Sequence, residues 1–163
     1  MKSALIFLAL LPAMLAGRPA AAQMFAGYDE FCRVPVIIVP NPQGASAARD
    51  NFGNPVIFID PSVMMNWTAS RVFFLAHECG HHSLGHSLPQ GMWFRHTQYW
   101  ATRRQELEAD CWAARQLAQI GYHDDVRRMI RQFVSMGPAP QGTYPSGHDR
   151  ARTVARCAGI DSR

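Results

Sequence analysis

Residues 77–81 read His-Glu-Cys-Gly-His, in which His77 and His81 are four positions apart and Glu78 directly follows the first of them. If this segment is helical, residues four apart project from one face, and both imidazoles can then reach one metal ion. Glu78 lies about 100° further round such a helix, near enough to hold a water molecule. Zinc lowers the pKa of a water molecule bound to it, and a neighbouring carboxylate can then accept a proton from that water. We therefore predict that His77 and His81 are zinc ligands and that Glu78 is a general base.

Two histidines on an ordinary helix are the alternative interpretation, because a bare H-E-x-x-H also arises by chance. Three features favour the metal site: the segment is predicted to be helical, the chain is predicted to be exported, and a carboxylate ligand is available further along the chain. The sequence thus predicts one Zn²⁺ per chain.

The third ligand decides the class of site. A metzincin requires glycine at position 84 and histidine at position 87, and this chain has Leu84 and Ser87 there. Gly85 and His86 are displaced from that pattern by one residue, so His86 is a poor candidate ligand.

A glutamate on a second helix is the better candidate, within Glu106-Leu107-Glu108-Ala109-Asp110. Glu106 and Asp110 lie on one helix face, about 6 Å apart along the axis. We predict that Glu106 binds the ion, while Asp110 accepts a hydrogen bond from the distal nitrogen of a ligand histidine and fixes its tautomer. Glu108 points to a different face and is predicted to be solvated.

Together, H-E-x-G-H and E-x-E-A-D resemble the gluzincin peptidases that include the CAAX prenyl proteases, the heat-shock membrane protease HtpX and the periplasmic outer-membrane-assembly metalloproteases. The resemblance extends from about Pro55 to the C-terminus. It implies that His77, His81 and Glu106 bind zinc, that Glu78 is catalytic and that Asp110 orients a ligand. Without the membrane helices or helical repeats of those proteins, the chain is expected to be a minimal catalytic core.

A weaker part of the resemblance lies near the C-terminus. Family members often carry a T-H-P-S-like segment with an arginine six residues after the histidine, and here Tyr144 stands in the histidine position with Arg150 six residues later. A tyrosine hydroxyl can donate a hydrogen bond to an oxyanion, and Arg150 would anchor the segment or share the charge. His148 is the second candidate donor, and an ordinary aromatic beside a proline turn is the alternative for Tyr144.

The pattern of apolar residues and breakers predicts a small, mostly helical α+β domain with a short N-terminal sheet, which the resemblance makes zincin-like. The predicted strands are 34–39 and 55–60, with a loop over 43–54 between them. The predicted helices cover about 68–84, 97–119, 124–136 and 149–158.

The first 22 residues have the features of a secretory signal, with Lys2, an apolar run over 4–16 and a small-residue cleavage site ending at Ala22. We expect a mature domain of 23–163 in the periplasm or outside a bacterial cell. An uncleaved membrane anchor is the alternative. Loss of Lys2 and Arg18 reduces the formal charge from +4 to +2, which argues against a nucleic-acid partner.

All four cysteines follow the predicted signal, and an even number in an oxidising compartment predicts two disulfides. If Asp110 touches His77, the two helices approach each other near Cys79 and Cys111. We therefore expect Cys79–Cys111, which leaves Cys32–Cys157.

The expected function is hydrolysis of a peptide or protein substrate that lies extended along the edge of the 55–60 strand. Two alternatives remain. One is a non-catalytic zinc-binding module acting in periplasmic assembly, against which Glu78 argues because a structural site needs no base. The other is hydrolysis of a non-peptide amide.

Overall fold

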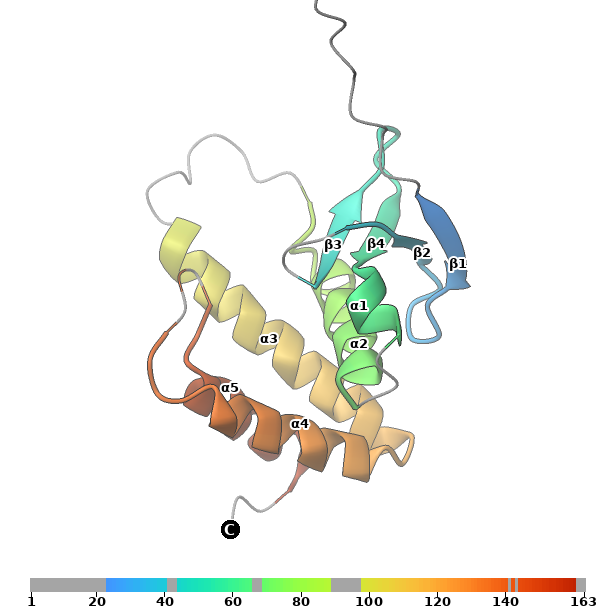
Figure 1. Cartoon of the computed structure of the whole chain (residues 1–163). Helices are drawn as coiled ribbons and strands as arrows, with labels where there is room; N and C mark the ends of the chain where they lie inside the picture. The colour runs from blue at the N-terminus through green and yellow to red at the C-terminus, as the bar shows by residue number, and fades with distance from the viewer. Residues whose placement is uncertain are drawn as a thin grey trace, which may run out of the picture.

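The computed structural model describes residues 23–40, 44–65, 69–88, 98–140, 142 and 144–160. The predicted signal peptide lies outside these residues. A four-stranded sheet packs on one side of a central helix, α2, and three further helices pack on the other side (Figure 1). The predicted small α+β fold is confirmed.

The strands are β1 (Met24–Tyr28), β2 (Pro35–Ile38), β3 (Ala45–Arg49) and β4 (Pro55–Ile59), in the spatial order β1-β2-β4-β3. The central pair, β2 and β4, is parallel and corresponds to the two predicted strands. The outer strands each pair antiparallel with their neighbour.

Strand β3 corrects the prediction of a loop over 43–54. Its sequence, ASAAR, has little intrinsic strand propensity, and it becomes a strand by pairing with β4, whose Ile57 and Ile59 are fully buried. The neighbouring β4 strand is therefore interior, and the expected substrate edge at 55–60 is wrong. Of these two strands, β3 forms the edge of the sheet.

The helices are α1 (Pro61–Met65), α2 (Ala69–Ser83), α3 (Gln98–Gln119), α4 (His123–Ser135) and α5 (Gly147–Ala158). The four long helices were predicted to within two residues at each end, whereas α1 and β1 were not predicted. The α5 helix begins earlier than predicted because Ser146 caps it, its hydroxyl accepting a hydrogen bond from the Asp149 N–H at 3.1 Å.

Helix α2 contributes to two separate hydrophobic clusters. Phe73 and Ala76 pack among the helices with residues such as Leu117, and Leu75 packs against the sheet with Ile57. A helix buried on both sides has little freedom to rotate or slide, because each large buried side chain contributes about 1.5–3 kcal/mol. The histidines and glutamate of residues 77–81 are therefore carried on a rigid support.

The described cysteines form the disulfides Cys32–Cys79 and Cys111–Cys157, so the expected pairing of Cys79 with Cys111 and of Cys32 with Cys157 is wrong. The helices do approach each other at His77 and Asp110, as expected. However, Cys79 is two residues beyond His77, about 200° round the helix, and its side chain leaves α2 on another side. It meets Cys32 in the turn between β1 and β2, while Cys111 meets α5.

The two disulfides indicate an oxidising environment. Within the described part of the chain, no helix is both long and apolar enough to cross a membrane.

Peptide mapping without reduction should recover Cys32 joined to Cys79 and Cys111 joined to Cys157. Replacing Cys111 and Cys157 together with alanine should lower the free energy of unfolding, measured in urea, by about 2–5 kcal/mol. The Cys32 and Cys79 double replacement is the matched comparison, since the sequence separations are 46 and 47 residues. A peptide joining Cys79 to Cys111 would contradict this pairing.

Candidate metal centre

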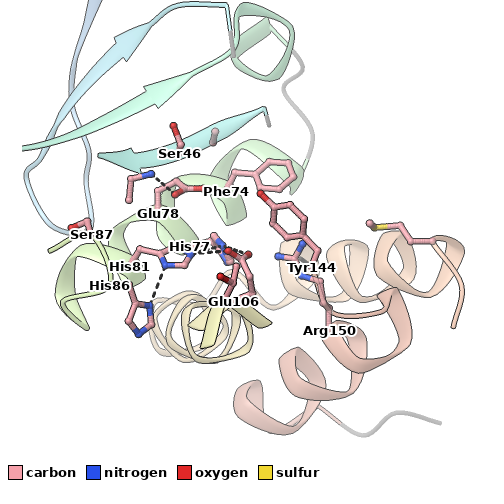
Figure 2. Close-up of a pocket in the computed structure, with 14 residues that line it drawn as sticks. Ser46, Phe74, His77, Glu78, His81, His86, Ser87, Glu106, Tyr144 and Arg150 are labelled. Atoms are coloured by element: carbon pink, nitrogen blue, oxygen red, sulfur yellow. Dashed lines mark hydrogen bonds and ion pairs between the residues drawn. The ribbon is translucent and has the colours of Figure 1, made fainter. Parts of the chain in front are cut away.

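The three predicted ligands converge from two helices (Figure 2). The Nε2 atoms of His77 and His81 on α2 lie 3.1 Å apart. Glu106 on α3 places Oε2 at 3.2 Å from the Nε2 of His77 and Oε1 at 3.4 Å from the Nε2 of His81. The helical spacing thus has the consequence expected from the sequence.

The donor atoms of this cluster fit a cation. The His77 Nδ1 is 2.9 Å from an oxygen of Asp110, which as a carboxylate can only accept, so the neutral imidazole presents a lone pair at Nε2. The buried Oε2 of Glu106 has no hydrogen-bond partner among the described residues, although it lies 3.2 Å from the Nε2 of His77. Two imidazole nitrogens and a carboxylate facing one point suit Zn²⁺ and related divalent ions.

The electrostatics of the cluster also favour a positive charge. Burial lowers the pKa of His77, but the adjoining carboxylates of Asp110 and Glu106 outweigh this effect and raise the pKa to about 10. Burial acts to raise the pKa of Glu106, but the neighbouring His77 and His81 hold it well below its usual range. The carboxylates therefore make this an anionic pocket that stabilises a cation between the rings.

Another group of metal-ligand types, Asp29 with Cys32 and Cys79, is less suited to an ion. Both of its sulfurs are joined in a disulfide, so neither is a thiolate.

Glu78 is buried beside the two histidines and is held by the sheet. Its Oε2 accepts a hydrogen bond from the Ala47 N–H of β3 at 2.6 Å. Burial raises the pKa of Glu78, and the neighbouring His77 and His81 act in the opposite direction. The carboxylate predicted to be the base is therefore fixed from the side of the pocket opposite to α3.

Asp110 is fully buried and joins three helices. Besides its bond with His77, it accepts hydrogen bonds from the Nε and Nη2 of Arg150 on α5, both at 2.7 Å. The guanidinium carbon of Arg150 lies 4.1 Å from the centre of the Phe133 ring. Burial acts to raise the pKa of Asp110, but Arg150 and His77 hold it below its usual range. Arg150 thus anchors Asp110, a role that was not predicted from the sequence, where Arg150 was expected to anchor the segment around Tyr144 or to share the charge of the oxyanion.

Two glycines let the helices approach closely enough for these contacts. A Cβ on Gly80 would lie 3.2 Å from the backbone oxygen of Ala109, so this glycine of the motif packs α2 directly against α3. A Cβ on Gly147 would overlap the backbone oxygen of Phe133, so the start of α5 sits directly on the end of α4. The first approach brings Glu106 to the histidines, and the second sets the position of α5 and Arg150.

Tyr144 lines the same pocket, which has a volume of about 490 Å³, whereas His148 does not line it. Figure 2 shows the Tyr144 hydroxyl directed into the pocket, toward the side where Phe74 and Glu78 lie. Burial raises the pKa of Tyr144, and Glu106 and Glu78 raise it further, so the hydroxyl keeps its proton. His148 lies in the first turn of α5, where its backbone N–H donates to Gly137. Of the two candidate donors, Tyr144 is therefore the one placed in the pocket.

Sequence reasoning missed the surroundings of His81. The Nδ1 of His86 lies 3.1 Å from the Nδ1 of His81, and the Nε2 of His86 lies 3.2 Å from Glu108. Glu108, predicted to be only solvated, is partly exposed but also pairs with Arg104. The signal that could have found His86 is Gly85, a residue suited to end a helix.

Comparisons with protein-family models, with curated proteins and with solved structures found no match to this chain.

Proposed function

We propose that this protein is a zinc-dependent endopeptidase of the gluzincin type, exported by its N-terminal signal to the periplasm or the cell exterior. The observation that carries the proposal is the convergence of His77, His81 and Glu106 on one point, with the Glu78 carboxylate buried beside it in an open pocket. The two disulfides support export.

In the proposed reaction the bound Zn²⁺ supplies Lewis acidity toward water and the scissile carbonyl. Glu78 accepts a proton from the attacking water and donates it to the nitrogen of the departing amine. Asp110 holds the Nδ1–H of His77, which keeps the Nε2 lone pair directed at the ligand site. The Tyr144 hydroxyl donates a hydrogen bond to the oxygen that gains negative charge in the transition state.

The proposed substrate is an extended peptide that pairs with β3. This strand is the edge of the sheet next to the pocket, and its residues Ala45, Ser46 and Ala47 line the pocket. Main-chain pairing to a sheet edge holds a peptide without requiring a particular sequence. Because the Ala47 N–H already contacts Glu78, the same strand that would align the peptide also positions the base.

A non-catalytic zinc-binding module is the alternative, and the position of Glu78 argues against it. A structural zinc site is closed by four protein ligands, whereas the described residues of this cluster offer three, with the Glu78 carboxylate beside them. Hydrolysis of a non-peptide amide would use the same residues. A proteome-wide cleavage screen comparing the wild type with Glu78→Gln separates an endopeptidase from both alternatives, since only an endopeptidase yields new peptide termini that depend on Glu78.

Glu78→Gln should retain zinc and the fold and lower turnover by about 10²–10⁴-fold, because the amide oxygen still accepts the Ala47 N–H but cannot take a proton. Glu106→Ala should instead lose zinc, measured by metal analysis after dialysis. Asp110→Ala should weaken zinc binding by about 10–100-fold, because it acts through a ligand. Wild-type zinc affinity in Glu106→Ala would contradict the gluzincin assignment. Wild-type turnover in Glu78→Gln would contradict the proposed role of Glu78 as the base.

Tyr144→Phe should lower kcat by about 10²–10³-fold, because the lost hydrogen bond is made mainly in the transition state. KM and zinc content should stay nearly unchanged. His148→Ala is the matched control and should have a much smaller effect, since His148 does not line the pocket. Steady-state kinetics measure kcat for both variants. If Tyr144→Phe keeps the wild-type kcat while His148→Ala lowers it strongly, His148 is the donor to the oxyanion.

A further inference from the structure

The end of helix α2 has a backbone geometry that brings two histidines together. Gly85 has a φ of +76°, a conformation that favours glycine. Its N–H donates to the carbonyl of His82 at 3.1 Å, and the N–H of His86 donates to the carbonyl of His81 at 2.8 Å. These two bonds define a Schellman cap, in which the residue after the left-handed position contacts the residue five before it.

The side chains in this contact are imidazoles, whereas such caps commonly use a hydrophobic pair. The rings of His81 and His86 have their centres 5.1 Å apart and are inclined at 68°, with the two Nδ1 atoms 3.1 Å apart. On its other side, the Nε2 of His86 lies 3.2 Å from an oxygen of Glu108. The second oxygen of Glu108 accepts a hydrogen bond from the Nε of Arg104 at 2.7 Å.

The hydrogen-bonding capacity of each group then fixes the protons along this chain. A carboxylate can only accept, so the proton between His86 and Glu108 belongs to His86 Nε2. Neutral His86 then has a lone pair at Nδ1, and the proton between the two rings belongs to His81 Nδ1. This leaves the Nε2 of His81 unprotonated, and that atom is the one that faces His77 and Glu106.

We infer that His86, supported by Glu108, is a positioning residue that holds His81 in the tautomer and orientation needed to bind the metal. The inference rests on the proposed metal site. Each ligand histidine then has a partner that orients it through its Nδ1 atom: Asp110 on α3 orients His77, and His86 in the cap of α2 orients His81. Unlike Asp110, which is a buried carboxylate, His86 does this without placing a further anion against the site.

The test compares His86→Leu, which removes the acceptor, with His86→Asn, whose amide oxygen can occupy the place of Nδ1. The control is His82→Gln, because His82 contacts Val56 and Ser87 rather than a ligand. Affinity for Zn²⁺ is measured by competition with a chromophoric chelator. The tautomer of His81 is read from nitrogen-15 correlation spectra of the metal-free protein.

We expect His86→Leu to weaken Zn²⁺ binding by about 10–100-fold and to shift His81 from the Nδ1–H toward the Nε2–H tautomer. His86→Asn should restore most of the Zn²⁺ affinity and most of the Nδ1–H tautomer of His81. His82→Gln should change neither the affinity nor the tautomer. Glu108→Ala, at a partly exposed position, should shift the Zn²⁺ affinity and the His81 tautomer in the same direction by a smaller amount. This variant replaces His86→Leu in the test if His86→Leu does not fold.

Wild-type affinity together with an unchanged His81 tautomer in either the Leu variant or Glu108→Ala would overturn the inference. So would an Asn variant no better than the Leu variant. If the wild type bound no Zn²⁺ at all, the proposed function would fail, but the tautomer measurement in the metal-free protein would still decide the role of His86.

Discussion

A carboxylate with no exposure to solvent stands at the junction of three helices, and the arrangement of the candidate site depends on it. Asp110 on α3 contacts His77 on α2 and is held by both donor nitrogens of Arg150 on α5. A buried charge is tolerated only when it is paired and hydrogen-bonded, and removing one partner of such a pair costs about 3–5 kcal/mol. The requirement that Asp110 be satisfied therefore fixes the relative positions of α2, α3 and α5.

Close packing and a covalent bond hold the same three helices in place. Gly80 allows α2 to touch the backbone of α3, and the disulfide from Cys111, next to Asp110, ties α3 to the helix that carries Arg150. The second disulfide, from Cys79, ties α2 to the turn between β1 and β2. Each helix that carries a ligand is thus restrained by a disulfide close to His77 or Asp110, so the donor atoms are positioned before any ion binds.

The sequence was most informative where the determinants of structure are local. Helical spacing predicted that His77 and His81 share one helix face and that Glu106 and Asp110 share another, because a helix repeats within a few residues. Strand β3 depends instead on pairing with the next strand, β4, and the disulfides depend on which distant segments meet. The ASAAR segment has no strong preference of its own, and the partner of Cys79 depends on where the turn after β1 lies. His86 was missed for an intermediate reason: Gly85 signals the cap, but the hydrogen bond to His81 matters only once the ligand site exists.

The groups proposed to carry out the reaction come from both sides of the molecule. The ligands and their supports are held by the helical cluster around Phe73, whereas Glu78 is held at the sheet edge through Ala47. Among the helices and strands that the structure describes, α2 alone contributes buried residues to both hydrophobic clusters, so it couples the position of one layer to that of the other. A peptide paired with β3 would bind to the strand that fixes the base, so this strand would set the alignment of the peptide relative to Glu78. In the proposed enzyme, substrate registration and proton transfer would then share one support, while metal binding depends on another.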